Sequence, residues 1–189
     1  MTGVILSGGK NTRMGGQNKA LLRIREERLV DRTVRLFKSI FEEVILVTNS
    51  PLDYVDQDVR IVTDIIKGKG ALGGIYTGLF FAASSQSFVA ACDMPFLNKS
   101  FIQYMIINAV SSDILVPETI SGLQPLHAVY SRRCLQEVER LIAADRLKVT
   151  GIYEKFRVTK ISEDIIRSFD TEMKMFFNVN SPDDMKEMI

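Results

Sequence analysis

Residues 3–19 read GVILSGGKNTRMGGQNK, an apolar strand-like run followed at once by a glycine-rich segment. The segment carries three cations, Lys10, Arg13 and Lys19, and no acidic residue. Glycines let backbone N–H groups approach a phosphate closely, and Arg and Lys supply positive charge. Because open α/β sheets bind ligands at the carboxyl ends of their strands, this segment predicts a polyphosphate site. It is not a P-loop, since no Gly-Lys-Ser/Thr closes it, and a glycine-rich turn with solvated charges stays open as the alternative.

In the rest of the chain, short apolar runs alternate with segments of helical period, which is typical of an α/β domain with a mostly parallel sheet. Apolar residues at helical spacing mark helices near 30–41, 101–106 and 134–142, and residues 181–184 read as a helix start. We therefore expect residues 1–189 to form a single Rossmann-like three-layer domain with helices on both faces of the sheet. The expected strands are Gly3–Ser7, Val44–Thr48, Arg60–Thr63, Phe88–Ala91, Ile114–Val116, Leu126–Tyr130, Arg157–Ile161 and Phe176–Val179.

The composition narrows the possible partners and the compartment. With 24 Lys and Arg against 23 Asp and Glu, the net charge of +1 gives no general attraction to nucleic acid or to an anionic membrane. Two cysteines and one histidine supply neither a disulfide framework nor a zinc site, and no secretory signal is found, so we expect a cytoplasmic protein. Residues 71–92 are uncharged and long enough to span a bilayer, but polar residues 84–87 interrupt them, which disfavours a membrane span.

A second glycine cluster, residues 68–74, reads GKGALGG and fits the dinucleotide pattern G-x-G-x-x-G. Asp93 follows at about the distance of the acidic residue in that pattern, so a nicotinamide site is one alternative and a bare turn is another. Against the nicotinamide site, residues 64–67 separate the preceding strand from the first glycine, whereas that fingerprint turns tightly at the strand end. We expect the two glycine clusters to form two walls of one nucleotide pocket.

Several polar residues stand at strand ends. Asp93 and Asp64 each follow an apolar run, and the carboxylate of Asp93 is placed as a natural Mg²⁺ ligand beside substrate phosphates. Alternation along the last predicted strand puts Asn178 and Asn180 on one face. Each of these residues could instead only form a turn. For the single histidine, His127, a substrate contact and a structural role both stay open, and a hydrolase triad is unsupported because no G-x-S-x-G motif exists.

Taken together, these motifs resemble those of the molybdenum cofactor guanylyltransferases, members of the nucleotidyltransferase superfamily. They follow the family's order and spread over nearly the whole chain. The resemblance implies the α/β fold of the nucleotide-diphospho-sugar transferases. The segments that carry it are LSGG at 6–9, RMGG at 13–16, KALL at 19–22, LGGI at 72–75, CDMPF at 92–96, PLHAVY at 125–130 and FNVNSP at 177–182.

The resemblance implies a transferase that joins GTP to the phosphate of molybdenum-loaded molybdopterin, giving the guanine dinucleotide cofactor and pyrophosphate. GTP and molybdopterin are then the substrates, Mg²⁺ on Asp93 is the metal, and molybdoenzymes or their chaperones are possible partners. The residues expected to act in catalysis are Lys19, Arg13 and Asp93. The residues expected to bind the nucleotide are Leu6, Ser7, Gly8, Gly9, Lys19, Asn49, Asp64 and Asp93. The residues expected near the second substrate are His127, Asn178 and Asn180.

Two positions depart from the family pattern, because Ser7 stands where Ala is usual and Ala71 where Pro is usual. The pair Gly8-Gly9 favours guanine over cytosine by analogy alone. The alternatives within the same chemistry are a molybdopterin cytidylyltransferase and a sugar-phosphate nucleotidyltransferase. From other classes, the alternatives are an NAD(P)-dependent oxidoreductase and a non-catalytic nucleotide-binding adaptor.

Overall fold

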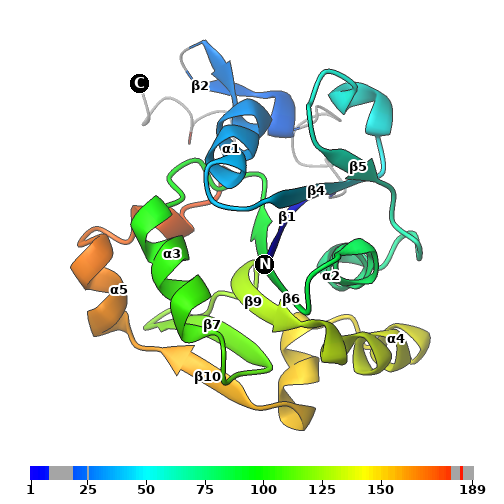
Figure 1. The fold of residues 1–189 in the computed structure, drawn as a ribbon, viewed down its shortest axis with the longest axis vertical. Helices are drawn as coiled ribbons and strands as arrows, with labels where there is room; N and C mark the ends of the chain where they lie inside the picture. The colour runs from blue at the N-terminus through cyan, green and yellow to red at the C-terminus, as the bar shows by residue number, and fades with distance from the viewer. Residues whose placement is uncertain (9–18, 25, 180–183, 185–189) are drawn as a thin grey trace.

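A central sheet organises the computed structural model, which describes residues 1–8, 19–24, 26–179 and 184 (Figure 1). Its described strands are β1 (Thr2–Ser7), β4 (Glu43–Thr48), β5 (Arg60–Val62), β6 (Gln86–Ala91), β7 (Ile114–Thr119), β8 (Gly122–Leu123), β9 (His127–Ser131) and β10 (Val158–Ile161). They lie in the order β10-β7-β9-β6-β1-β4-β5, with β8 paired to β7. The pairs that β1 makes with β4 and β6, and the pairs β4–β5 and β7–β10, are parallel. Only β9 runs against both of its neighbours in this order, β6 and β7.

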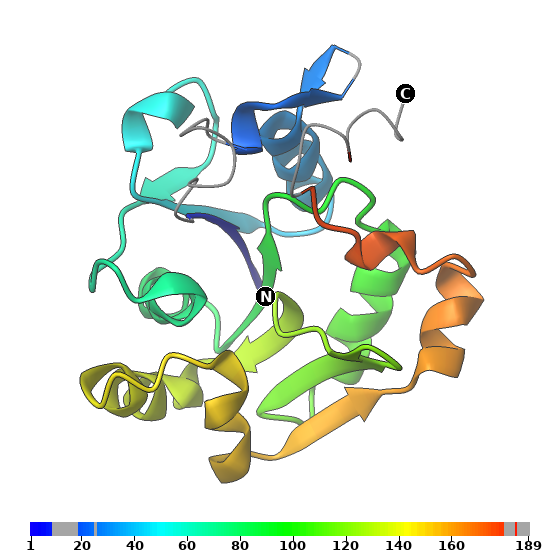
Figure 2. The same ribbon diagram turned by 180° about the vertical axis from the view of Figure 1, so that it is seen from behind.

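Helices cover both faces of the sheet, as predicted (Figures 1 and 2). The helices α1 (Leu29–Lys38), α3 (Lys99–Asn108) and α5 (Glu163–Phe169) pack on one face, and α2 (Gly70–Phe81) and α4 (Leu135–Ala143) pack on the other. A small hairpin of β2 (Arg23–Ile24) and β3 (Glu27–Arg28) precedes α1. The short 3-10 turns are η2 (Lys19–Leu21), η3 (Pro51–Tyr54), η4 (Arg132–Cys134), η5 (Val149–Lys155) and η6 (Lys174–Phe176).

The two faces of the sheet build two apolar cores. Along β1, Val4 and Leu6 point into the core under α2 and α4, whereas Ile5 points into the core under α1 and α3. Strands β4 and β6 alternate in the same way, because successive side chains of a strand point to opposite faces. The nearly continuous apolar runs of the sequence are therefore explained by burial on both sides.

Glycine lets α2 approach β1 closely. A methyl group placed on Gly78 would lie 2.5 Å from Cγ1 of Val4, a separation that real Cβ atoms do not reach. The first turn of α2 also depends on glycine, since Gly70 has a φ of +57°. The close contact holds the N-terminal end of α2 near the carboxyl end of β1.

The prediction of a last strand at Phe176–Val179 is wrong. The segment begins with the end of η6, and the described residues after it form no strand. The ring of Phe176 is partly buried and packs against the rings of Phe101 and His127, so this run lies against a helix-covered face and does not pair in the sheet. The predicted helix start at 181–184 lies, apart from Asp184, outside the described residues.

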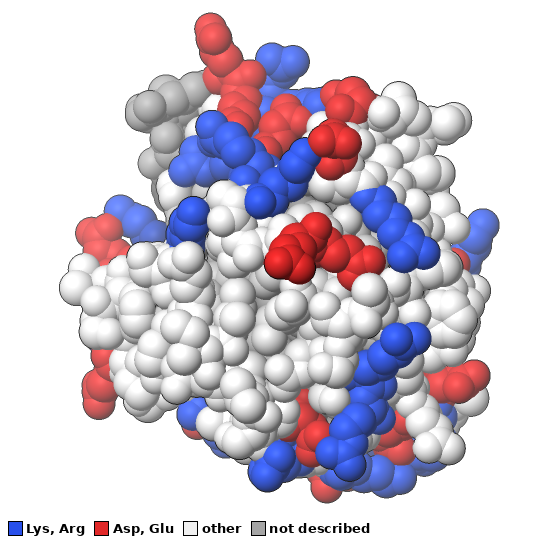
Figure 3. All heavy atoms as spheres, viewed as in Figure 1, with Lys and Arg blue, Asp and Glu red and all other residues white. Residues whose placement is uncertain are grey.

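The uncharged stretch 71–92 forms most of α2 and then β6, with a break between them. None of the helices in the described part of the chain is long and apolar enough to cross a membrane. On the face in Figure 3, groups of Lys and Arg side chains alternate with groups of Asp and Glu. The charge of this face is therefore mixed, in keeping with the net charge of +1.

Candidate active site

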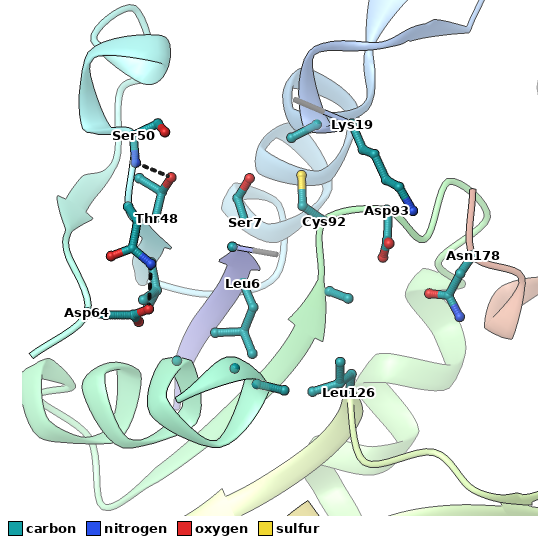
Figure 4. Close-up of a pocket in the computed structure, with 18 of the residues that line it drawn as sticks. Leu6, Ser7, Lys19, Thr48, Ser50, Asp64, Cys92, Asp93, Leu126 and Asn178 are labelled. Atoms are coloured by element: carbon teal, nitrogen blue, oxygen red, sulfur yellow. Dashed lines mark hydrogen bonds between the residues drawn. The ribbon is translucent and has the colours of Figure 1, made fainter. Parts of the chain in front are cut away.

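A cavity of about 610 Å³ lies where β1, β4, β5 and β6 end (Figure 4). These strands are parallel neighbours, so their carboxyl ends meet at one edge of the sheet, where open α/β sheets bind ligands. Because β9 runs in the opposite direction, its N-terminal neighbour Leu126 reaches the same edge and lines the cavity. The volume lies within the range of roughly 300–1,000 Å³ that is typical of small-molecule sites.

Most of the predicted nucleotide-binding residues line this one cavity. Three predicted residues, Gly9, Arg13 and Asn180, lie outside the described residues. Among the predicted site residues that the structure describes, His127 does not line the cavity. The predicted residues that line the cavity are Leu6, Ser7, Gly8, Lys19, Asn49, Asp64, Asp93 and Asn178.

One end of the cavity presents a carboxylate held by an amide. Asn49 follows β4, Asp64 follows β5, and Nδ2 of Asn49 donates to Oδ2 of Asp64 over 2.7 Å. Burial raises the pKa of the Asp64 carboxyl, and the hydrogen bond from Asn49 opposes this shift. The amide therefore orients one carboxylate oxygen and leaves the other able to accept hydrogen bonds.

The other end combines a lysine with a second carboxylate. Lys19 lies in η2, directly after the glycine-rich segment, and Figure 4 shows its ammonium group extended toward Asp93, which follows β6. Burial raises the pKa of the Asp93 carboxyl, and the positive charge of Lys19 opposes this shift. The carbonyl oxygen of Asp93 accepts a hydrogen bond from the N–H of Val179 at 2.9 Å, which brings Asn178 to the same end of the cavity.

The donor set at this end suits one class of metal ion. Among the described residues, no three His, Cys, Asp or Glu side chains gather into a metal-binding group. A closed structural zinc site is therefore not present in that part of the chain. A single carboxylate facing an open cavity suits Mg²⁺, which usually takes one or two carboxylates and completes its shell with substrate phosphates and water.

The second glycine cluster forms another wall of the cavity. Gly68 and Gly70 both have positive φ values, +76° and +57°, and α2 begins at Gly70. The residues Gly68, Gly70, Ala71 and Gly74 line the cavity. The structure thus brings the described parts of the two glycine clusters to one site, and Ala71 stands at the cavity wall.

His127 lies away from the cavity. Its side chain is fully buried, contacts the rings of Phe88, Phe101 and Phe176, and finds no hydrogen-bond partner among the described residues. Burial lowers its pKa to about 3, so the ring is neutral at physiological pH. Strand alternation explains this placement, because Leu126 faces the cavity and His127 faces the core under α3. The geometry favours the structural role over the substrate contact.

Sequence reasoning missed four residues near the cavity. Thr48 and Ser50 line it beside Asn49, and their place at the end of an apolar strand was a usable signal. Cys92 lines it next to Asp93. No local sequence pattern indicates Tyr54. Its hydroxyl oxygen lies 2.5 Å from Oγ of Ser7, a residue 47 positions earlier.

Comparisons with known proteins identify relatives of this chain. Residues 3–156 match the family described as the MobA-like NTP transferase domain. A molybdenum cofactor guanylyltransferase from Desulfosudis oleivorans is 38% identical, with 99% of this chain and 93% of that protein covered. The crystal structure of molybdopterin-guanine dinucleotide biosynthesis protein A from Archaeoglobus fulgidus superimposes with a TM-score of 0.86 at 26% identity, covering 100% of this chain and 96% of that one.

A more distant solved structure is a manganese complex of Rv0371c from Mycobacterium tuberculosis, with a TM-score of 0.70 at 16% identity over 99% of this chain and 96% of that one. At this identity the likeness concerns the fold, which is again the three-layer arrangement of the sheet and its helices. The family match covers most of the chain, and the relative from Desulfosudis oleivorans covers almost all of it. The chain belongs to the MobA-like NTP transferase family.

Proposed function

We propose that this protein transfers GMP from GTP to the phosphate of molybdenum-loaded molybdopterin, giving the guanine dinucleotide cofactor and pyrophosphate. The observation that carries this proposal is the arrangement of one cavity, with the Asn49–Asp64 pair at one end and Lys19 with Asp93 at the other. The relative from Desulfosudis oleivorans is named for this activity. Family membership also favours nucleotidyl transfer over an NAD(P)-dependent oxidoreductase.

The Asn49–Asp64 end suits a guanine base. Guanine carries an N1–H and a 2-amino group on one edge, and a carboxylate accepts from both at once. Asn49 already holds Oδ2 of Asp64 at 2.7 Å, so the carboxylate is oriented before the base arrives. Cytosine offers one amino group beside an acceptor nitrogen on the matching edge, and a carboxylate would repel that acceptor. This asymmetry supports GTP over CTP.

The Lys19 end suits the triphosphate. Lys19, the N–H of Gly8 and Arg13, which lies outside the described residues, would neutralise and orient the phosphates. In the reaction, an oxygen of the molybdopterin phosphate attacks the α-phosphorus of GTP, and the bond from that phosphorus to the β-phosphate oxygen breaks. A phosphate monoester with a second pKa of about 6 is largely dianionic at neutral pH, so no general base is required. Positioning and charge neutralisation then supply the catalysis.

Asp93 is the residue that would hold a divalent metal ion, and we infer Mg²⁺. The carboxylate faces the open cavity beside Lys19, which matches the open coordination that Mg²⁺ shares with phosphates. When bound, Mg²⁺ would neutralise charge on the reacting phosphates. Asn178 lies near Asp93 and would contact the molybdopterin phosphate, with Asn180 expected close by.

The setting of the reaction follows from the same proposal. Residues 1–189 would act as one domain in the cytoplasm, where both cysteines, which are free and buried, would stay reduced. The dinucleotide product would then pass to molybdoenzymes or to their chaperones.

A nucleotide panel tests this function. The enzyme, Mg²⁺ and molybdenum-loaded molybdopterin are mixed with GTP, ITP, CTP or UTP, and pyrophosphate release is measured. We expect GTP to be preferred over ITP, which lacks the 2-amino group, and both over CTP and UTP. In Asp64→Asn the preference for GTP over ITP should fall by about tenfold, because the charged acceptor of the 2-amino group is lost. A preference for CTP or UTP in the wild-type enzyme would contradict the guanine assignment.

A further inference from the structure

An ion pair joins the second glycine cluster to the end of α4. Nζ of Lys69 donates to Oδ1 of Asp145 over 2.9 Å, although the two residues are 76 positions apart. Lys69 stands between Gly68 and Gly70, which line the cavity, whereas neither member of the pair lines it. Helices α2 and α4 pack on the same face of the sheet, so the pair ties the start of α2 to the turn that ends α4 (Figure 1). The proposed chemistry assigns no role to this pair.

Asp145 occupies a position that favours glycine. Helix α4 ends in a Schellman motif, in which the N–H of Asp145 donates to the carbonyl oxygen of Ile142 and the N–H of Arg146 donates to that of Leu141. The motif requires a left-handed residue, and Asp145 has a φ of +54°. A residue with a Cβ atom is strained in this conformation, whereas glycine is not. Local helix chemistry therefore does not explain an aspartate at this position.

Lys69 is equally unsuited to its own position. It is the N-cap of α2, where Ser, Thr, Asn or Asp would accept hydrogen bonds from the first N–H groups of the helix. An ammonium group has no acceptor, and the Lys69 side chain makes no capping hydrogen bond. Each charge of the pair also lies at the unfavourable end of its own helix dipole and meets the favourable end of the other helix. The two side chains are therefore explained by their contact with each other.

The turn between β5 and α2 gains a support from this contact. Gly68 and Gly70, on either side of Lys69, have φ values of +76° and +57° and no Cβ atom to restrict the backbone. The N–H of Ile65 donates to Oγ1 of Thr77 over 3.0 Å, which ties the turn only to its own helix, α2. The ion pair ties the turn to α4 instead. Because Gly68 and Gly70 line the cavity, a displacement of this turn would change the wall that meets a nucleotide.

We propose that Asp145 is a positioning residue for the nucleotide: its carboxylate holds Lys69, and the turn so held presents Gly68 and Gly70 to GTP. The pair is exposed, with 29% of the Lys69 side chain and 76% of the Asp145 side chain accessible. Exposed ion pairs are weak, so the expected effect on nucleotide affinity is about threefold. The inference rests on the proposed function, because it takes GTP as the ligand.

Calorimetric titration with GTP in the presence of Mg²⁺ tests this proposal on the wild type, Asp145→Gly, Lys69→Met and the double variant. Each single variant should raise the Kd for GTP about threefold, and the double variant should raise it by the same factor, because the two side chains act through one contact. In steady-state pyrophosphate release, the KM for GTP should rise while kcat stays unchanged. Reversal of the pair, Lys69→Glu with Asp145→Lys, should return the Kd to within about 1.5-fold of the wild type.

Two controls separate positioning from stability and from net charge. Glycine removes the strain of a positive φ at position 145, so the urea midpoint of Asp145→Gly should equal or exceed that of the wild type while GTP binds less tightly. Lys160 and Glu118 form a matched exposed pair at 2.8 Å between β10 and β7, and neither residue lines the cavity. Lys160→Met removes the same charge as Lys69→Met and should keep wild-type GTP affinity.

Three results would overturn the proposal: wild-type GTP affinity in both single variants, weaker binding in Asp145→Gly but not in Lys69→Met, or a lower urea midpoint in Asp145→Gly. These results differ from a failure of the proposed function. If the wild-type protein itself binds no GTP, the function and this inference fail together. If the wild type binds GTP and both single variants bind it equally well, only this inference fails.

Discussion

Asp64 and Asp93 occupy opposite ends of one cavity, and their neighbours separate their proposed roles. Burial raises the pKa of both carboxyls, so at each site a negative charge has to be compensated by neighbouring groups. Asp64 is held by the Asn49 amide and suits the donor edge of a base. Asp93 has Lys19 nearby and suits a metal ion with phosphates. The side chain beside each carboxylate, Asn49 or Lys19, therefore decides which kind of ligand that carboxylate suits.

Lys19→Ala and Asp93→Asn should each lower kcat for guanylyl transfer by about a hundredfold or more, because a lost preorganised charge contact typically costs about 3–4 kcal/mol. Asp93→Asn should leave the free energy of unfolding equal or slightly higher, since it removes a charge that burial penalises. Steady-state pyrophosphate release and urea denaturation measure the two quantities. Lys38→Ala, at an exposed ion pair with Asp58, is the control and should keep wild-type turnover. Near-normal turnover in both site variants would refute the proposed roles.

At the scale of elements, the contact of α2 with β1 positions the second wall of the cavity. Gly70, Ala71 and Gly74 lie in the first turns of α2 and line the cavity, and Gly78, further along, rests on Val4 of β1. A side chain at Gly78 would push the helix away from the strand. Glycine lowers the stability of a helix, but at Gly78 it allows α2 to lie close to β1.

Gly78→Ala should destabilise the protein by about 1–3 kcal/mol, because overpacking at 2.5 Å outweighs the gain of up to about 1 kcal/mol in helix propensity. Urea denaturation measures the change. The control is Gly151→Ala, where the new methyl group would meet Leu141 at an ordinary 3.6 Å and stability should change little. A Gly78→Ala variant as stable as the wild type would show that α2 is free to shift.

Elements with local signals were predictable, and elements that depend on distant contacts were not. The runs that became β1, β4 and β6 are apolar along their length because both of their faces are buried. The run 176–179 looks the same in the sequence, yet Phe176 is a partly buried residue of a turn that packs on Phe101 and His127, and no local pattern separates such a turn from a strand. In the same way, Asp64 and Asp93 were predictable because they follow apolar strands. The contact of Tyr54 with Ser7 spans 47 positions, and no local sequence pattern predicts it.

At the scale of the whole molecule, His127 joins three parts of the fold. Its ring contacts Phe88 of β6, Phe101 of α3 and Phe176 of η6, the turn that leads to Asn178. The ring is neutral because burial lowers its pKa to about 3. Protonation of this single group therefore opposes the packing that brings the segment around Asn178 to the cavity.

The stability of the wild type should fall as the pH is lowered from about 6.5 toward 3. In this window the unfolded chain, with a histidine pKa of about 6.5, takes up a proton that the folded chain does not, so unfolding is favoured by up to about 1.4 kcal/mol per pH unit. His127→Leu should remove this contribution, measured as the difference between urea-denaturation profiles at several pH values. Ser87→Ala is the matched control: its buried hydroxyl also finds no partner among the described residues but does not titrate, so its profile should run parallel to the wild type. A parallel profile for His127→Leu would contradict the buried, neutral histidine.

In the proposed reaction, the cavity holds a guanine nucleotide while it is joined to molybdopterin. The most direct measurement is the mass of the product formed from GTP, Mg²⁺ and molybdenum-loaded molybdopterin by the purified enzyme. We expect the mass of the guanine dinucleotide, with one pyrophosphate released for each molecule formed and almost no product from Asp93→Asn. Hydrolysis of GTP without a dinucleotide, or a dinucleotide formed from CTP in preference to GTP, would contradict it.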